Sequence, residues 1–208
     1  MEAGSLVRSI CVFCGSSFGN HPAYRDLAHA AGAAIAHRGL RLVYGGGRVG
    51  LMGVAADAAL AAGGTVIGVI PASLVEQEVE HTGLSELHIT DTMHERKALM
   101  ADLSDGFLAL PGGYGTLDEL CEILTWSQLG IHAKPAALLG TLGFWQPLLD
   151  AFDRIVATGF LRPAHREMVL ARDIEMSTGA GEAIQSMLTE MGSWRPATTA
   201  KWGDRNVR

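Results

Sequence analysis

The sequence predicts a single α/β domain in which helices cover both faces of a doubly wound parallel sheet, giving three αβα layers. Apolar runs of strand length alternate with longer segments of helical period, which is the pattern of βαβ units. The 26 glycines gather at the ends of these segments, where strands turn tightly into helices. A chain of 208 residues, 48% hydrophobic and 18% charged, suits one compact domain. We expect that domain over residues 1–192 and a disordered tail over 193–208.

The first half of the chain is predicted to hold three strands and two helices. Apolar side chains recur three and four residues apart between positions 22 and 37, which predicts an amphipathic helix that ends at Gly39. A glycine-rich turn, GGGRVGLMG, leads from the second strand into an alanine-rich helix that ends near Ala62. The expected strands are 9–15, 41–44 and 65–70.

The second half continues the alternation after a polar, acidic connection at 73–85. This connection has no clear period, and loops of such length often serve a site, so we keep it as a candidate lid. Further strands bring the predicted sheet to six or seven. The expected strands are 87–90, 106–110 and 136–139, and the expected helices are 94–104, 117–129, 144–158 and 181–191.

Composition disfavours several classes of partner. A formal net charge of −6 and a pI near 5.7 give no basic face for nucleic acid or anionic lipid. No run reaches the roughly 18 apolar residues of a membrane span. Three cysteines are too few for a secreted disulfide framework, and the start of the chain lacks a signal-peptide core. We therefore expect a cytoplasmic protein with a small-molecule ligand and neither a nucleic-acid nor a membrane partner.

The C-x-x-C pair, Cys11 and Cys14, falls in the first predicted strand. Residues three apart in a strand point to opposite faces, which argues against a redox or zinc site. The sequence also lacks H-E-x-x-H and G-x-S-x-G motifs, so neither metal-dependent hydrolysis nor a serine nucleophile is supported. We expect no metal.

The glycine-rich turn after the second predicted strand carries a G-x-G-x-x-G pattern, formed by Gly45, Gly47 and Gly50. A dinucleotide site of this type also needs an acid at the end of the next strand, where this sequence has VIGVIP. NAD binding is therefore disfavoured. Two alternatives stay open: a purely structural turn, or a second backbone surface at Gly45, Gly46 and Gly47 that faces a phosphate or sugar.

The stretch PGGYGTLDE at 111–119 predicts a phosphate-binding turn that opens a helix. Glycines let the backbone approach an anion closely, and the N–H groups and dipole of a helix N-terminus favour negative charge. The rival interpretation is a capping box, T-x-x-E, formed by Thr116 and Glu119. A cap alone does not require the preceding glycines, so the phosphate turn is favoured.

Carboxylates cluster beside this turn, because Asp118, Glu119 and Glu122 lie close together on the predicted helix. Phosphate and carboxylate repel, so such a group makes sense if it faces the sugar, where it could orient water or stabilise developing positive charge. Crowding of like charges could also raise one pKa. Taken alone, Glu122 is interpreted as solvated surface.

Basic residues open the helix after the fourth strand, in the stretch MHERK at 93–97. Arg96 and Lys97 could reach an anion at the carboxyl rim of the sheet. Residue type alone does not separate this role from solvated surface. His94 lacks a partner at ligand spacing and is interpreted as a capping or surface residue.

Four motifs together resemble the LOG family of cytokinin riboside 5′-monophosphate phosphoribohydrolases, often labelled lysine decarboxylases. The resemblance covers about residues 10–172. It implies a Rossmann-like homodimer that hydrolyses the N-glycosidic bond of a nucleoside 5′-monophosphate without a cofactor, giving free base and ribose 5-phosphate. The motifs are CGSS at 14–17, YGGGRVGLMG at 44–53, MHERK at 93–97 and PGGYGTLDE at 111–119.

The resemblance also implies roles for individual residues. Arg96 and Glu119 would be the catalytic pair: the backbone of the turn would hold the phosphate, Glu119 would stabilise an oxocarbenium-like sugar and direct water, and Arg96 would steer it. Asp118 stands where family members more often have glutamate. The residues that would line the substrate are Glu78, Lys97, Gly113, Tyr114, Gly115, Thr116, Leu117, Asp118 and Thr125.

A carrier module that binds a nucleotide or cofactor without turnover is the alternative function. Such a module gives no reason for Glu119 beside the sugar, so hydrolysis is favoured. The sequence leaves open whether the substrate is a cytokinin nucleotide or AMP, and which group protonates the leaving base. The lysine decarboxylase label has no support, because no lysine stands in a recognisable pyridoxal-phosphate setting.

Overall fold

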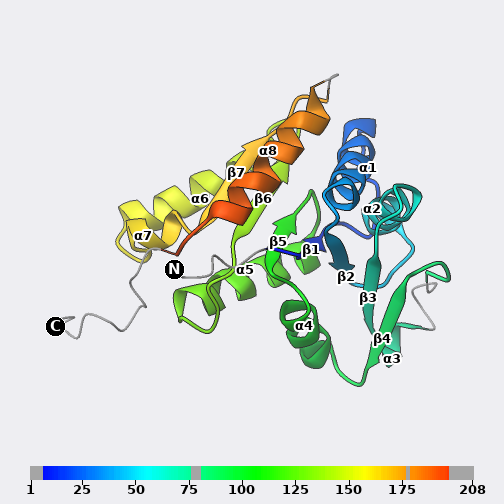
Figure 1. The fold of residues 1–208 in the computed structure, drawn as a ribbon. Helices are drawn as coiled ribbons and strands as arrows, with labels where there is room; N and C mark the ends of the chain where they lie inside the picture. Colours follow the sequence, from blue (N-terminus) through cyan, green and yellow to red (C-terminus); the bar gives the residue numbers. More distant parts are fainter. Residues whose placement is uncertain (1–6, 76–80, 177–178, 197–208) are drawn as a thin grey trace, which may run out of the picture.

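The computed structural model, which describes residues 7–75, 81–176 and 179–196, contains one seven-stranded sheet (Figure 1). All six strand pairings are parallel, in the order β4-β3-β2-β1-β5-β6-β7. The predicted doubly wound sheet is therefore confirmed. The strands are β1 (Ser9–Phe13), β2 (Arg41–Tyr44), β3 (Val66–Pro71), β4 (Glu86–Thr90), β5 (Gly106–Ala109), β6 (Ala136–Gly140) and β7 (Val169–Asp173).

Helices cover both faces of the sheet and complete the three layers. One face packs against α1 (Pro22–His37), α2 (Gly50–Ala61) and α8 (Ala180–Ser193). The opposite face packs against α4 (Met93–Asp102), α5 (Tyr114–Gln128) and α6 (Gln146–Ala157). Two short helices, α3 (Ala72–Val75) and α7 (Pro163–Arg166), lie in connections.

The alternation of β1 sends its side chains into two separate cores. Ile10 and Val12 pack with the α1 and α2 layer, whereas Cys11 and Phe13 pack with the α4 and α5 layer. Cys14, just beyond the strand, belongs to the first of these cores. The two cysteines therefore point to opposite faces, as predicted from their spacing.

Small residues bring α1 and α2 close together. A Cβ at Gly32 of α1 would overlap the Ala55 carbonyl of α2, so the two backbones touch at this crossing. At the start of α2, a Cβ at Gly50 would overlap the backbone of Ser16 and Ser17. This contact fixes the turn after β2 against the turn after β1, at the carboxyl edge of the sheet.

Several elements differ from their predicted bounds. Helix α5 begins at Tyr114, three residues before the predicted 117, and the sequence does not predict β7, α3 or α7. The predicted tail starts too early, because α8 continues to Ser193. Residues 197–208 of that tail and residues 76–80 of the candidate lid lie outside the described part. Among the described residues, no helix combines the length and apolarity needed to cross a membrane.

Candidate functional site

The sheet changes winding direction between β1 and β5. Helix α1 leaves β1 toward one face and α5 leaves β5 toward the other, and ligands of doubly wound sheets bind at such switch points. The two turns that follow these strands are joined by a hydrogen bond of 3.0 Å from the Gly15 N–H to the Pro111 carbonyl. Between them lies a cavity of about 240 Å³ with an aromatic wall of Phe18, Tyr24 and Phe144.

The turn after β5, residues 112–116, exposes the start of α5 and is called the amide turn below. Gly113 is the N-cap and provides no side-chain cap, so the N–H groups of the first helical residues have no partner within the helix. Gly113 and Gly115 are exposed, and Tyr114 is 94% exposed. Backbone donors together with the helix dipole make this turn suitable for an anion.

The rival capping box is not formed. Thr116 lies inside the first turn of α5 with only 3% of its surface exposed, and its hydroxyl packs where a Cβ of Gly112 would lie. The chain does hold a capping box, but at the start of α4, where Thr92 and Glu95 cap each other. Glu119 is therefore free of a capping role.

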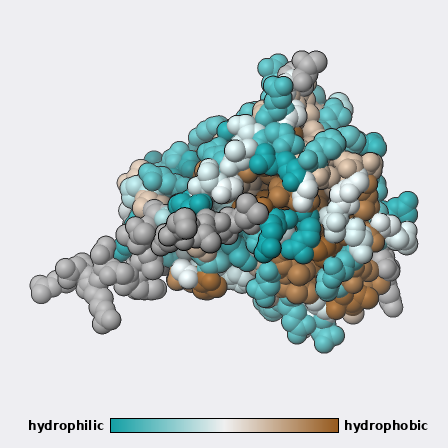
Figure 2. Space-filling view, in the orientation of Figure 1, coloured by the Kyte–Doolittle hydropathy of each residue, from teal (hydrophilic) through white to brown (hydrophobic). Residues whose placement is uncertain are grey.

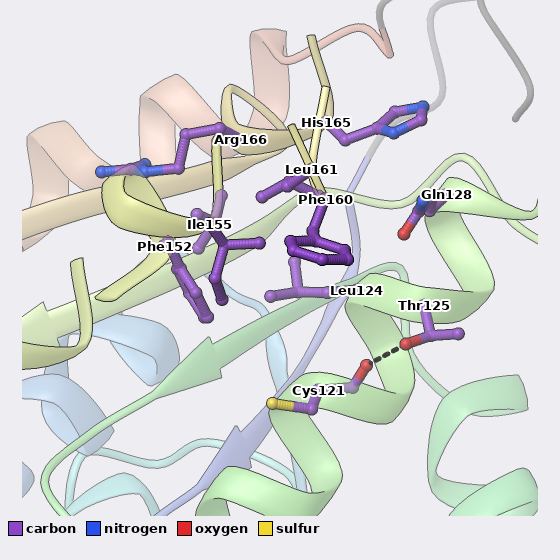
Figure 3. Close-up of a pocket in the computed structure, with 11 residues that line it drawn as sticks. Cys121, Leu124, Thr125, Gln128, Phe152, Ile155, Phe160, Leu161, His165 and Arg166 are labelled. Carbon is purple, nitrogen blue, oxygen red and sulfur yellow. Dashed lines mark hydrogen bonds between the residues drawn. The ribbon is translucent and has the colours of Figure 1, made fainter. Parts of the chain in front are cut away.

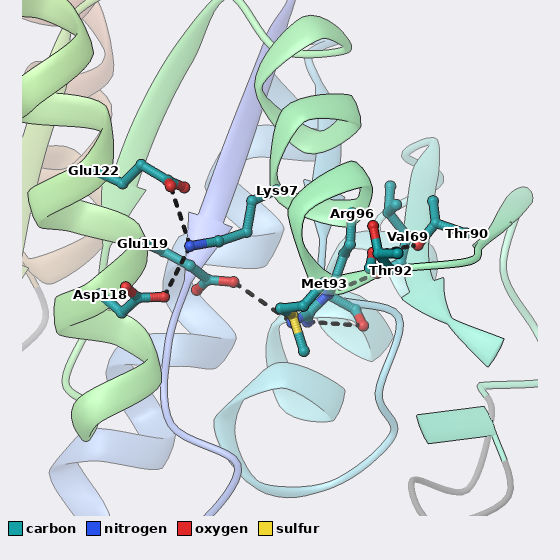
Figure 4. Close-up of polar contacts among 10 residues, drawn as sticks. Val69, Thr90, Thr92, Met93, Arg96, Lys97, Asp118, Glu119 and Glu122 are labelled. Atoms are coloured by element: carbon teal, nitrogen blue, oxygen red, sulfur yellow. Dashed lines mark hydrogen bonds and ion pairs between the residues drawn. The ribbon is translucent and has the colours of Figure 1, made fainter. Parts of the chain in front are cut away.

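Arg96 and Glu119 meet between α4 and α5 (Figure 4). The distance from Arg96 Nη1 to Glu119 Oε1 is 3.7 Å, and the two side chains are 11% and 14% exposed. Arg96 Nε donates to the Val69 carbonyl at 3.1 Å, Nη2 donates to the Gly45 carbonyl at 3.2 Å, and Nη1 contacts the Met93 sulfur at 3.3 Å. These contacts occupy three of the five N–H donors of an arginine. Nη1 keeps one N–H beside Glu119, and Nη2 keeps one for a ligand.

Burial raises the pKa of Glu119 to about 7. The nearby charges act in both directions, because Arg96 and Lys97 lower this pKa while Asp118 and Glu122 raise it. Desolvation disfavours the charged form of a carboxyl group, and it outweighs the 3.7 Å ion pair here. A carboxyl group that titrates near neutrality is suited to exchanging a proton with substrate or water.

Lys97 joins α4 to α5 through two carboxylates (Figure 4). Its Nζ lies 3.1 Å from Asp118 Oδ2 and 3.1 Å from Glu122 Oε1. Burial works against its charge, but the hydrogen bonds to Asp118 and Glu122 prevail and raise the pKa of Lys97. The interpretation of Glu122 as solvated surface is wrong, since its side chain is only 25% exposed and paired.

The structure brings together part of the predicted site. Arg96, Lys97, Asp118 and Glu119 gather beside the amide turn, and His94 is exposed as interpreted. Residues 45–47, called the carbonyl turn below, are buried, and a ligand contact there stays a prediction. Glu78 lies outside the described residues. No signal in the sequence indicates Met93 beside Arg96, or the pairing of Glu122.

Thr125 lies in a second pocket (Figure 3), whose lining includes neither Arg96 nor Glu119. Its hydroxyl donates to the Cys121 carbonyl at 2.7 Å. The wall is mostly apolar, and Phe160 in it is 87% exposed. Lining side chains come from α5, α6 and the segment before β7, and they include Leu124, Phe152, Ile155, Phe160 and Leu161.

The chain is similar in sequence to known enzymes. A family model described as possible lysine decarboxylase matches residues 52–178. The cytokinin riboside 5′-monophosphate phosphoribohydrolase of Rhodococcoides fascians is 52% identical over 187 residues, covering 89% of this chain and 93% of that protein. The protein of the same name from Arabidopsis thaliana is 47% identical over 171 residues, covering 82% and 80%.

Solved structures share the fold. A molybdenum cofactor binding protein from Rippkaea orientalis superposes with a TM-score of 0.62 at 24% identity, covering 86% of this chain and 96% of that one. The Moco carrier protein of Chlamydomonas reinhardtii gives a TM-score of 0.61 at 26% identity, covering 88% and 98%. These structural similarities show the Rossmann-like fold alone, since one fold can serve several functions.

Proposed function

This chain belongs to the LOG family, whose curated members are phosphoribohydrolases, and we propose that it hydrolyses the N-glycosidic bond of a nucleoside 5′-monophosphate. The products are the free base and ribose 5-phosphate. The observation that carries the proposal is the largely buried Arg96–Glu119 pair beside an uncapped helix N-terminus. A cytokinin nucleotide and AMP are the two candidate substrates.

The spacing along α5 suits this substrate. In the proposed complex the phosphate accepts hydrogen bonds from the N–H groups of the amide turn. Gly115 and Glu119 are four residues apart, so they share one face and are separated by roughly 6 Å along the helix axis. A ribose held by its 5′-phosphate at the first position can therefore present its anomeric carbon to the second.

The proposed chemistry uses Glu119 in its ionised form. The bond from C1′ to the base nitrogen breaks and its electron pair leaves with the base, while the carboxylate stabilises the oxocarbenium-like sugar. Water then adds to C1′ and gives its proton to Glu119. The departing base takes up one proton, and loss of the proton from Glu119 restores the carboxylate, so the net reaction consumes one water. Arg96 holds the carboxylate in place through Nη1, and one N–H of Nη2 remains for the substrate. Met93, 41% exposed, would offer an apolar surface to the base beside Arg96.

Lys97 does not support decarboxylation of lysine. A lysine that forms a Schiff base with pyridoxal phosphate must reach its neutral form readily. Lys97 is held by two carboxylates that raise its pKa, which is the opposite condition. In the proposed enzyme it lines the site and keeps Asp118 and Glu122 in place.

Turnover is the direct test. Purified protein is incubated with AMP and, separately, with isopentenyladenosine 5′-monophosphate, and free base and ribose 5-phosphate are quantified by chromatography. Adenosine is the matched control and should be cleaved far more slowly, because it lacks the group that the amide turn holds. Tight nucleotide binding without release of base from either monophosphate would point to a carrier and overturn the proposal.

We further propose a homodimer that forms through the second pocket (Figure 3). Helix α6 is amphipathic, yet none of its residues is buried, and large exposed apolar surfaces often mark interfaces. Such a dimer would turn Thr125 toward the partner. Phe160→Asp should convert the dimer to a monomer in size-exclusion chromatography with light scattering; a monomeric unmodified protein contradicts the proposal.

The free cysteines, Cys11, Cys14 and Cys121, support placement in the reducing cytoplasm.

A further inference from the structure

Gly45 and the Arg96 guanidinium occupy adjoining space. The Gly45 carbonyl accepts a 3.2 Å hydrogen bond from Arg96 Nη2, and both residues are buried. A Cβ built on Gly45 would overlap Nη2 and would lie 3.1 Å from Cζ. Any other residue at position 45 would therefore place its side chain where the guanidinium now lies.

The backbone conformation does not explain the glycine at this position. Gly46 and Gly50 have φ angles of 76° and 62°, in the region that favours glycine. Gly45 is not among the residues with positive φ, so an L-residue could adopt its conformation. The space taken by Arg96 is what requires glycine at position 45.

Two further contacts complete the surroundings of the guanidinium. The Val69 carbonyl belongs to β3, which is buried along its whole length, and it accepts from Nε at 3.1 Å. The Met93 sulfur lies 3.3 Å from Nη1, one turn before Arg96 on α4. Acceptors on two sides leave Nη1 directed at Glu119. A planar guanidinium held by a fork of acceptors has little rotational freedom.

We propose that Gly45, the first glycine of the G-x-G-x-x-G pattern, is a positioning residue for Arg96. The absence of a side chain at Gly45 makes room for the Arg96 guanidinium, and the Gly45 carbonyl holds it by a hydrogen bond. The geometric part stands on the contacts above, and the catalytic consequence rests on the proposed function. A methyl group at position 45 pushes the guanidinium away from the carbonyl and from Glu119. Arg96 then orients the carboxylate poorly.

The first experiment compares Gly45→Ala with Gly181→Ala. Gly181 lies on α8, where an added Cβ would have nothing within 4 Å, and its φ is not positive, so the same chemical change should have little effect there. Gly45→Ala is expected to lower kcat tenfold or more while KM changes less than threefold, because the amide turn still holds the phosphate. A Gly45→Ala enzyme with unchanged kcat would overturn the inference that Gly45 supports catalysis by positioning Arg96.

The pH profile supplies a readout that a merely structural defect would not move. The charged groups around Glu119 are Arg96 and Lys97 from α4 and Asp118 and Glu122 from α5. Arg96 lowers the Glu119 pKa, so its displacement should shift the midpoint of the kcat profile to higher pH. Gly181→Ala should leave the midpoint in place, and an unmoved midpoint in Gly45→Ala contradicts the inference.

A double-mutant cycle in thermal stability tests the geometry without relying on turnover. Gly45→Ala should lower Tm by roughly 4 °C or more in the unmodified protein, because the added methyl group overpacks a filled space. In the Arg96→Ala background the same change should cost little, because the space is then empty. Equal losses in both backgrounds overturn the proposal, whether or not the enzyme cleaves nucleotides.

Discussion

The two glycine-rich turns lie at the carboxyl edge of the same sheet and present opposite backbone groups. The carbonyl turn is buried, and its Gly45 oxygen accepts a hydrogen bond from the Arg96 guanidinium. The amide turn is exposed at Gly113 and Gly115 and presents the unpaired N–H groups of a helix start. One turn holds a cation, and the other is open to an anion. A glycine-rich stretch therefore shows where the backbone can be approached closely, but not the charge of the group that approaches.

Glu119 pairs with Arg96, which the carbonyl turn holds, and it lies on α5, the helix that the amide turn begins. A substitution of Glu119 should therefore give the largest effect on kcat. Glu119→Gln is expected to lower kcat by about 10³-fold or more, since it removes the charge that stabilises the oxocarbenium-like sugar. The affinity for ribose 5-phosphate should stay within threefold, because the amide turn holds the phosphate. Rate assays and calorimetric titration measure the two quantities, and an active variant would remove Glu119 from the chemistry.

The same variant should be more stable than the unmodified protein at pH 8. The folded-state pKa of Glu119, about 7, lies above the usual glutamate value of 4.5, so ionisation opposes folding. The penalty grows from pH 4.5 to pH 7 and is nearly complete above pH 7, at most about 3 kcal/mol, and this figure already includes the attraction to Arg96, which lowers the pKa. Urea unfolding at pH 5 and pH 8 should show an advantage of Glu119→Gln that increases with pH.

The pH dependence of turnover gives the next largest effect. If ionised Glu119 is the working form, kcat falls about tenfold for each pH unit below 7 and is level above it. This acidic limb of the profile is measured as kcat at saturating substrate from pH 5 to pH 9. The substrate phosphate also titrates, with a pKa near 6, so a control must show that the limb belongs to Glu119. Lys97 lowers the Glu119 pKa, and Lys97→Met should therefore raise the midpoint of the kcat profile. A rate that declines above pH 7 would falsify the assigned protonation state.

The sequence predicts those features that depend on neighbouring residues. The period of β1 separates Cys11 from Cys14, and the glycines at a strand end mark the amide turn. The predicted start of α5 is three residues late, because sequence rules look for a capping side chain and Gly113 provides none. Pairings such as Gly45 with Arg96, 51 residues apart, depend on which strands become neighbours, and one sequence does not reveal that.

Removing one donor from the amide turn should give a smaller loss. Tyr114 is the first helical residue of α5, a position where proline is tolerated. Tyr114→Pro deletes one N–H, and loss of a hydrogen bond to a charged group should raise KM roughly tenfold or more. Tyr114→Ala removes the exposed ring and keeps the donor, so it is the matched control and should have a normal KM. If both variants behave alike, the backbone of this turn does not bind the phosphate.

Lys97→Met should have the smallest effect on substrate binding. If the amide turn holds the phosphate, KM should rise less than threefold, whereas the unfolding free energy should fall by about 1 to 2 kcal/mol because Asp118 and Glu122 lose their shared cation. Lys134 provides a control, since its Nζ donates to the Ala101 carbonyl at the end of α4, and Lys134→Met should affect stability without affecting KM. KM is measured at pH 7 from initial rates, and the unfolding free energy is measured at the same pH by urea unfolding. A hundredfold rise in KM confined to Lys97→Met would mean that Lys97 leaves its carboxylates and binds the phosphate itself, and the amide turn would then share the anion with a side chain.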